Sequence, residues 1–339
     1  MIRSLRRCCF SLAVVAGMTL PAAASTQLTG AGSTFDYPFF SKAFYAYNQK
    51  NPDLTVNYQS IGSGGGIAQF TAKTVDFGAT DVPMSAAELA RANAPVLQIP
   101  VTLGGEAIAY NLPGVNALRL TRQVLVDIYL GKILKWNDPQ IAKLNKGASL
   151  PDTAIIVVHR SDGSGTTYIF SDFLSHVSGE WKSKVGTGKS LSWPAPSSVG
   201  AKGNEGVAGQ VKSTPGAIGY VEMAYVVENH MQGATLENKA GKWVDCTPQT
   251  VAAAAASKPE VTATNFSIVD SSAAGGYPIS GYSWVVVYKK PEARAKELYN
   301  VLSWLVGPQG QENAKSVDYV PLPRNVQDAA AATLRQMQR

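Results

Sequence analysis

A short polar run directly after an apolar segment holds the side chains with the clearest chemical potential. Residues 159–168 read HRSDGSGTTY and follow the apolar run AIIVV at residues 154–158. A guanidinium, a carboxylate, several hydroxyls and two glycines stand close together in this run. Three interpretations fit the pattern: a catalytic serine in a tight turn, a cradle for a phosphate group, or a polar loop between a strand and a helix.

The serine in this run, Ser164, lacks the surroundings of a catalytic nucleophile. A serine-hydrolase elbow reads GxSxG, but the residue two positions before Ser164 is Asp162. Side chains alternate along a strand, so Arg160 and Asp162 should share one face while His159 takes the other. We therefore expect a structural role for His159 rather than a pairing with Ser164.

The pair Arg160 and Asp162 fits an oxyanion site. A guanidinium can hold two oxygens in parallel, and a carboxylate behind it can fix the orientation of that fork. An ordinary surface ion pair is the alternative that this run leaves open.

Three turns rich in Gly, Ser and Thr share one design, in which a turn beside a strand opens a helix. They are GAGSTF (30–35), IGSGGG (61–66) and SDGSGT (161–166). The amino terminus of a helix offers unpaired N–H groups and a partial positive charge, which attract anions. None of the turns has the lysine of a P-loop or the spacing GxGxxG, so nucleotide binding is not supported.

One acid, Asp81, follows the apolar segment that begins at Val75. An acid at the end of a strand is usually solvated or caps a helix. Beside an anion it would be repulsive, unless the anion carries a proton that it can donate to the carboxylate. Hydrogen phosphate carries such a proton and sulfate does not, so Asp81 predicts discrimination between the two.

Eight segments carry a resemblance to a known family, in that family's order: LTGAGSTF, VNYQSIGSGGGI, TVDFGATDVPMS, DIYLGKILKWND, RSDGSGTT, WKSKVGTG, AKGNEGV and PGAIGYVEMAY. With them the chain resembles the periplasmic phosphate-binding proteins of ABC-type phosphate importers. The resemblance extends from about Leu28 to about Leu322.

The resemblance implies a phosphate site without catalytic residues, metal or cofactor. Asp81 would accept the phosphate proton, Arg160 would be the cationic contact, and Asp162 would orient it. The other positions would supply backbone N–H groups or hydroxyls. The complete implied set is Thr34, Phe35, Ser63, Asp81, Arg160, Asp162, Ser164, Gly165 and Thr166.

The implied partners are inorganic phosphate and an ABC importer, with its membrane permease subunits and its ATPase. The protein would bind phosphate with high affinity and deliver it, as a monomer. Three alternatives remain open: a binding protein for sulfate or another tetrahedral oxyanion, a phosphatase with Ser164 as nucleophile, and an extracellular adhesion or stress protein.

The elements that must position these residues alternate between strand-like and helix-like segments, which favours an α/β fold. Apolar residues recur at helical spacing in 37–47 and 169–177. Strand-like segments at 54–58, 75–81 and 154–160 place the turns at the ends of strands. Two further strands, VLQIPVTL and EAIAYNLP, are expected on either side of Gly104 and Gly105.

The length exceeds what a single core usually holds, so two lobes are expected. The resemblance implies a two-lobed periplasmic binding protein, in which each lobe is a sheet flanked by helices and hinge strands join the lobes. Lobe one would comprise residues 25–100 and 278–339, and lobe two residues 101–277.

The amino terminus, MIRSLRRCCFSLAVVAGMTLPAAAS, has the pattern of a secretory signal peptide. A basic start, an apolar core of about a dozen residues and a small-residue exit predict cleavage after Ala24 and export to the periplasm as a soluble protein. Without residues 1–24, 27 basic residues oppose 24 acidic ones, which gives a net charge of +3. Nucleic-acid binding is therefore not expected.

The cysteine count limits both disulfides and metal sites. Cys246 alone remains after cleavage, so an internal disulfide is excluded and stability must come from burial. One cysteine and three histidines also make a Cys/His zinc cluster unexpected.

Overall fold

The computed structural model describes residues 25–339 of the chain. The predicted signal peptide, residues 1–24, lies outside them. Within the described part, none of the helices combines the length and the apolar character that crossing a bilayer requires.

Nine strands form one sheet with the order β2-β1-β3-β12-β4-β8-β6-β7, and β9 also pairs with β4. A second sheet holds three short strands in the order β11-β10-β5. The strands are β1 Thr26–Gly32, β2 Leu54–Ser60, β3 Phe77–Thr80, β4 Val96–Tyr110, β5 Arg119–Leu120, β6 Ile156–Arg160, β7 Ser198–Ala201, β8 Ala217–Glu222, β9 Gln232–Gly233, β10 Thr235–Glu237, β11 Trp243–Val244 and β12 Ser280–Tyr288.

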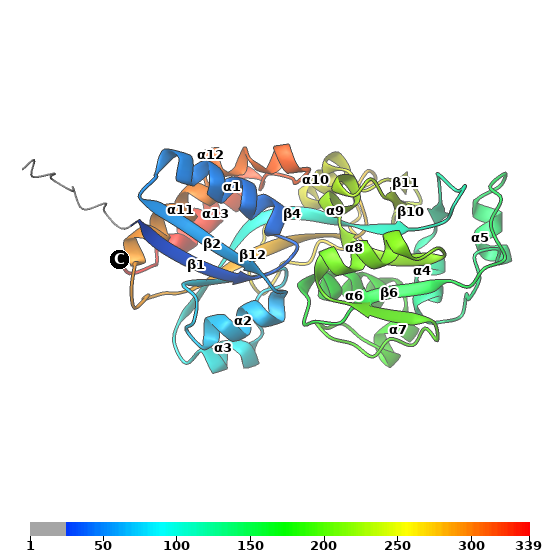
Figure 1. Cartoon of the computed structure of the whole chain (residues 1–339), viewed down its shortest axis with the longest axis horizontal. Helices are drawn as coiled ribbons and strands as arrows, with labels where there is room; N and C mark the ends of the chain where they lie inside the picture. The colour runs from blue at the N-terminus through cyan, green and yellow to red at the C-terminus, as the bar shows by residue number, and fades with distance from the viewer. Residues whose placement is uncertain (1–24) are drawn as a thin grey trace, which may run out of the picture.

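Helices cover both faces of the large sheet (Figure 1). They are α1 Tyr37–Lys50, α2 Ser63–Thr71, α3 Ala86–Ala92, α4 Arg122–Tyr129, α5 Pro139–Leu144, α6 Gly165–Val177, α7 Gly179–Lys184, α8 Gly203–Ser213, α9 Met223–Glu228, α10 Pro248–Ala256, α11 Ala295–Val306, α12 Pro308–Gln311, the 3₁₀ helix η1 Ala314–Val317 and α13 Arg324–Leu334. The predicted α/β fold with two lobes is confirmed.

The two lobes are joined by β4 and β12, which run across the middle of the molecule in Figure 1. The first part of β4 pairs with β12, and its last five residues, Glu106 to Tyr110, pair with β8 of lobe two. The strands of both lobes are therefore linked through one hydrogen-bonded path. The predicted boundary between residues 100 and 101 lies inside β4, and the predicted boundary between residues 277 and 278 lies just before β12.

The expectation of two separate strands around Gly104 and Gly105 is wrong. Both glycines stay in the ladder of β4, opposite Gly281 and Ser280. A Cβ at Gly104 would meet the ring of Phe35 at 2.7 Å, and one at Gly105 would meet Cys246 Sγ at 2.6 Å. These glycines permit close packing on a continuous strand, so they do not mark a turn.

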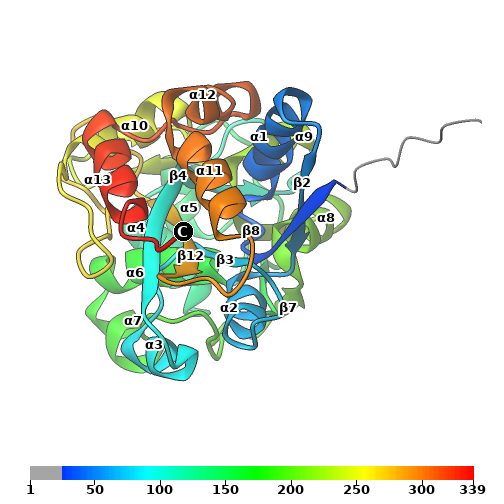
Figure 2. The ribbon, with the colours of Figure 1, turned by 90° about the vertical axis from the view of Figure 1, so that its left-hand side faces the viewer.

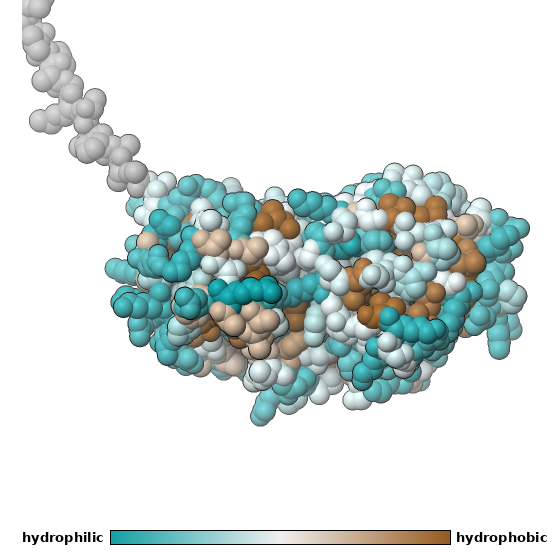
Figure 3. Space-filling model, turned by 90° about the horizontal axis from the view of Figure 1, so that it is seen from below, coloured by the Kyte–Doolittle hydropathy of each residue, from teal (hydrophilic) through white to brown (hydrophobic). Residues whose placement is uncertain are grey.

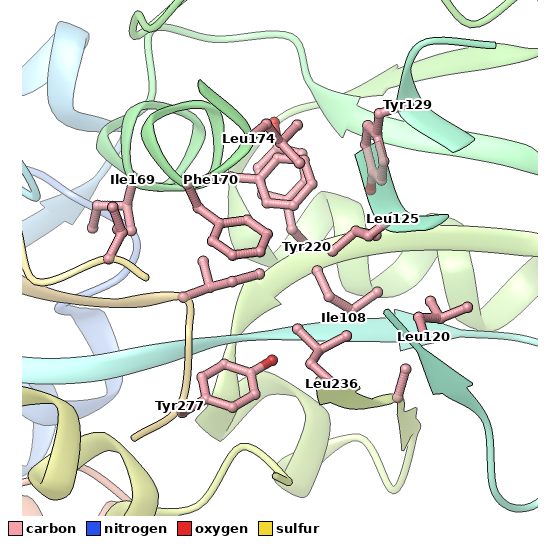
Figure 4. Close-up of a cluster of buried hydrophobic side chains, with 14 of the residues drawn as sticks. Ile108, Leu120, Leu125, Tyr129, Ile169, Phe170, Leu174, Tyr220, Leu236 and Tyr277 are labelled. Atoms are coloured by element: carbon pink, nitrogen blue, oxygen red, sulfur yellow. The ribbon is translucent and has the colours of Figure 1, made fainter. Parts of the chain in front are cut away.

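Each lobe has a hydrophobic core on both faces of its part of the sheet. In lobe one, α1, α11 and α13 lie above the strands and α2 and α3 lie below them (Figure 2). In lobe two, Phe170 of α6 stacks on Tyr220 of β8, with ring centroids 4.3 Å apart, and both lie above Ile108 of β4 (Figure 4). The space-filling view shows mostly hydrophilic groups, with hydrophobic ones gathered mainly over the right-hand half (Figure 3).

Parallel pairing places the predicted turns at common edges of the sheet. In lobe one β1 pairs in parallel with both β2 and β3, and in lobe two β6 pairs in parallel with both β7 and β8. The carboxyl ends of parallel strands lie at the same edge, where ligands bind in open α/β sheets. The loops after these strands therefore converge where the two lobes meet.

Candidate functional site

The turns after β2 and β6 meet directly across the two lobes. Ser63, the first residue of α2, accepts hydrogen bonds at Oγ from the backbone N–H of Gly165 at 3.1 Å and of Asp81 at 3.3 Å. Gly64 donates from its N–H to the carbonyl of Gly163 at 2.8 Å. The structure thus brings together two of the sequence-predicted turns at the amino termini of α2 and α6.

Arg160 and Asp162 form the predicted unit on one face of the strand end. Arg160 donates from Nε to Oδ1 of Asp162 at 2.7 Å and from Nη2 to Oδ2 at 2.6 Å. Burial would lower the pKa of Arg160, but the bonds to Asp162 raise it; Arg160 in turn holds the pKa of Asp162 below its ordinary value despite burial. The guanidinium side chain is 1% exposed, so this pair is not an ordinary surface ion pair.

The remaining guanidinium nitrogen of Arg160 connects this unit to lobe one. Its Nη1 donates to Oγ1 of Thr166 at 3.2 Å, and Thr166 donates to Oδ2 of Asp81 at 3.2 Å. One chain of hydrogen bonds therefore connects Arg160 of β6, Thr166 of α6 and Asp81 after β3.

Asp81 is buried and accepts hydrogen bonds at both oxygens. Its Oδ1 accepts from the hydroxyls of Ser33 and Ser283, the latter at 2.9 Å. Burial raises the pKa of Asp81, while the hydrogen bonds from the two serines oppose that rise. Both oxygens of Asp81 therefore act as acceptors, Oδ1 from Ser33 and Ser283 and Oδ2 from Thr166.

Thr34 is held by two residues of lobe two. Its Oγ1 accepts from the backbone N and from Nδ2 of Asn204, at 3.1 and 2.7 Å. Its carbonyl accepts from the hydroxyl of Tyr225 at 2.6 Å. The next residue, Phe35, buries its ring against Tyr319 in lobe one, so its side chain belongs to the core and its backbone belongs to the turn.

Ser164 takes a capping position. Its Oγ accepts from the N–H of Thr167 at 3.0 Å, and its own N–H donates to the carbonyl of Lys189 at 2.9 Å. His159 lies on the opposite face, as predicted, with its ring 5.0 Å from that of Trp193. The hydrogen bonds of Ser164 therefore do not join it to Asp81, Arg160 and Thr166.

Three site residues were not predicted as such: Ser33, Asn204 and Ser283. Ser33 lies in the turn GAGSTF, and Asn204 lies in AKGNEGV, which has the same strand, glycine and helix design as the predicted turns. Ser283 lies inside β12, and its single hydroxyl proton is shared between Asp36 Oδ2 at 2.7 Å and Asp81 Oδ1 at 2.9 Å. The chain offers no local signal for a hydroxyl in an apolar strand interior.

Three buried acids lie behind the site: Asp36, Glu106 and Glu222. Asp36 accepts from Ser283 Oγ at 2.7 Å and Glu222 accepts from the N–H of Ala224 at 2.7 Å. Both carboxyl oxygens of Glu106 lack a hydrogen-bond partner among the described residues. Burial raises the pKa of all three carboxyls well above the ordinary value.

We expect Glu106→Gln to stabilise the protein increasingly as the pH rises from 5 to 8. Folded Glu106 keeps its proton where the unfolded chain has lost it, so the free energy of unfolding of the wild type falls above about pH 4.3, by at most about 1.4 kcal/mol per pH unit. Glutamine has no proton to lose. Urea unfolding at several pH values measures the difference, with Glu260→Gln at an exposed acid as control. If the difference in the free energy of unfolding between the two proteins did not change with pH, the pKa of Glu106 would not be raised in the folded protein.

Among residues 25–339, no group of three or more His, Cys, Asp or Glu side chains is placed to hold a metal ion. A groove of about 630 Å³ lies elsewhere, between α1 and the pair α8 and α9, where Tyr37, Tyr45 and Glu228 line it. None of the predicted site residues lines this groove.

Comparison with known proteins gives consistent matches over most of the chain. The PBP superfamily domain matches residues 19–309. The phosphate-binding protein PstS of Pasteurella multocida is 47% identical over 306 residues, which cover 88% of this chain and 87% of that protein. PstS of Xylella fastidiosa (strain Temecula1) is 45% identical over 308 residues, 89% of this chain and 83% of that protein.

Solved structures share the fold at low sequence identity. The phosphate-binding protein of Stenotrophomonas maltophilia has a TM-score of 0.72 at 18% identity, covering 91% of this chain and 94% of that chain. A periplasmic phosphate-binding protein solved with phosphate, PfluDING, has a TM-score of 0.71 at 21% identity, covering 91% and 93%. The chain therefore belongs to the PBP superfamily and, within it, to the family of phosphate-binding proteins PstS.

Proposed function

We propose that this protein captures inorganic phosphate with high affinity where its two lobes meet and delivers it to an ABC-type importer. The observation that carries the proposal is Asp81: a buried acceptor set among donors from both lobes. Hydroxyls of Ser33 and Ser283 in lobe one and of Thr166 in lobe two donate to it, and Arg160 donates in turn to Thr166. The names of the relatives and the phosphate in PfluDING support the same ligand.

The proposed phosphate-binding residues are those predicted from the sequence: Thr34, Phe35, Ser63, Asp81, Arg160, Asp162, Ser164, Gly165 and Thr166. Arg160 supplies the positive charge, and Asp162 keeps its fork in place. The other donors are neutral, and dipoles and hydrogen bonds replace the hydration of the anion. Phosphate binds between the lobes, and contacts that need both lobes drive closure.

We expect Asp81→Asn to narrow the preference for phosphate over sulfate by about tenfold. A carboxylate accepts the proton of hydrogen phosphate and repels sulfate, whereas an amide can donate to either anion. Calorimetric titration with phosphate and sulfate measures the ratio. Asp76→Asn, at a half-buried and hydrogen-bonded acid in lobe one, is the control. An unchanged ratio would remove Asp81 from its proposed role.

Binding without catalysis is part of the proposal. A phosphatase would need a general base beside Ser164, but its Oγ is engaged with Thr167 N and His159 stacks on Trp193. Tight phosphate binding without hydrolysis of a chromogenic phosphate ester supports capture, and measurable hydrolysis contradicts it. An adhesion or stress protein would have no affinity for phosphate. The calorimetric phosphate titration therefore also distinguishes this alternative from phosphate capture.

The setting of the proposed function is the periplasm, reached through a signal peptide at residues 1–24. The protein acts there as a soluble monomer, and its partners are the permease subunits and the ATPase of the importer. We place the hinge in β4 and β12, with lobe one at 25–100 and 278–339 and lobe two at 101–277. The pairing of these two strands, which shifts its register between Ser283 and Trp284, supports that placement.

A further inference from the structure

Lys189 lies in the segment after α7 and forms an ion pair with Glu88 of α3. Its Nζ donates to Oε1 of Glu88 at 2.6 Å and to Oε2 at 2.8 Å. Both side chains are largely buried, with exposed fractions of 17% for Lys189 and 18% for Glu88. In Figure 1, α3 and α7 lie below β4 and β12, in different lobes. The pair therefore joins lobe one to lobe two outside the set of phosphate contacts proposed above.

This pair differs in kind from the other contacts between the lobes. Within residues 25–339 it is the only salt bridge whose two partners belong to different lobes, as divided above. The contacts of Thr34 with Asn204 and of Ser63 with Gly165 are hydrogen bonds between neutral groups. In the described part of the chain, a salt bridge thus holds the lobes together at one place only.

Glu88 is fixed in lobe one by a capping box at the start of α3. Its Oε2 accepts from the backbone N–H and the hydroxyl of Ser85 at 2.8 and 2.9 Å, and Ser85 Oγ accepts from the N–H of Glu88 at 3.3 Å. Burial would raise the pKa of Glu88, but the bonds from Lys189 and Ser85 lower it, so the carboxyl group is ionised at neutral pH. A carboxylate that is already oriented loses little conformational entropy when it pairs.

Lys189 is fixed in lobe two against α6. Its carbonyl accepts from the N–H of Ser164, the N-cap of α6, at 2.9 Å. The N–H of the preceding residue, Gly188, donates to Oγ of Ser171 within α6 at 3.2 Å. Lys189 thus contacts the amino terminus of α6 through its backbone and lobe one through its side chain.

We propose that Lys189 is a positioning residue for phosphate capture, whose ion pair with Glu88 holds the amino terminus of α6 against lobe one and slows the release of the bound anion. The proposal rests on the proposed phosphate function. The pair forms only where the lobes meet, so its free energy favours the closed form over the open one. It therefore adds to the affinity for a ligand that requires closure, without touching that ligand.

The test is a double-mutant cycle with Glu88→Gln, Lys189→Met and the variant that carries both changes. Glutamine keeps the capping box, and methionine keeps most of the apolar stem of lysine. In about 50 mM NaCl, each single variant should lose about fivefold in phosphate affinity, almost entirely as faster release of labelled phosphate. The double variant should also lose about fivefold, because both changes remove the same interaction.

Salt provides a readout that a merely structural role would not change. In about 1 M NaCl, where charges are screened beyond about 3 Å, the difference in affinity between the wild type and Lys189→Met should fall to about twofold. Three results would each overturn the proposal: losses that multiply in the double variant, a loss that is the same at both salt concentrations, and an unchanged affinity and release rate. If Lys189→Met does not fold, the same salt comparison with Glu88→Gln decides.

The matched control is Lys132→Met. Lys132 pairs with Glu180 inside lobe two, so this variant breaks an ion pair that closure of the lobes does not alter. It should keep the affinity and the release rate of the wild type. A wild type that binds no phosphate contradicts the proposed function itself, whereas a wild type that binds tightly beside variants that bind equally well contradicts only the role of Lys189.

Discussion

Replacing Arg160 with methionine is expected to weaken phosphate binding by about 1,000-fold. Methionine keeps much of the apolar stem but removes the buried guanidinium that Asp162 holds in a two-point grip. Two charge-assisted hydrogen bonds to the ligand contribute about 4 kcal/mol together, and each 1.4 kcal/mol corresponds to a factor of ten. Calorimetry or competition with labelled phosphate measures the loss.

The control for this prediction is Arg122→Met. Arg122 pairs with buried Asp270 in lobe two, so that variant breaks a comparable ion pair and leaves the site residues in place. It should lower the stability and keep the phosphate affinity. Arg160→Lys should fall between the wild type and Arg160→Met, because it retains the charge and loses the planar fork. A loss below tenfold in Arg160→Met would show that neutral donors alone hold the anion.

The sequence predicted those parts of the site that follow from local rules. Strand alternation placed Arg160 and Asp162 on one face and His159 on the other, and the structure has that arrangement. The turn pattern located the amino termini of α2 and α6, which meet at Ser63 and Gly165. These rules work because each depends on residues that are close together in the chain.

The contacts that were not predicted depend on distant parts of the chain. Ser283 reaches Asp81 because β12 pairs beside β3, about 200 residues later in the sequence. Asn204 reaches Thr34 because the lobes meet, although the spacing of the two residues carries no sign of it. Periodicity identifies a strand or a helix, but it does not say which elements become neighbours.

The long strand β4 shows a second limit of sequence patterns. Two adjacent glycines usually signal a turn, yet Gly104 and Gly105 continue the strand because Phe35 and Cys246 occupy the space of their missing side chains. Glu106 follows within the same strand, where a charged residue would normally indicate a solvent-facing position. Its complete burial depends on the lobe packing, which no local pattern encodes.

Gly165→Ala is expected to weaken phosphate binding by about 100-fold while the fold of each lobe is kept. A Cβ at this position would lie 2.6 Å from Asp81 Cβ and 2.7 Å from its backbone N. Alanine suits the first turn of α6, so the conflict lies solely in the approach of the two lobes. Such overpacking costs about 1–3 kcal/mol, and the upper end of this range corresponds to about 100-fold in affinity.

The same variant tests whether closure contributes to binding. Small-angle scattering should show that phosphate reduces the radius of gyration of the wild type and has a weaker effect on Gly165→Ala. Gly209→Ala is the matched control, since that glycine lies in α8 with open space where the Cβ would be, and it should bind and compact like the wild type. An unchanged affinity in Gly165→Ala would mean that Asp81 and the amino terminus of α6 need not come together around the ligand. The anion would then be held by one lobe alone, and the donors of the other lobe would contact it only after binding, without contributing to the affinity.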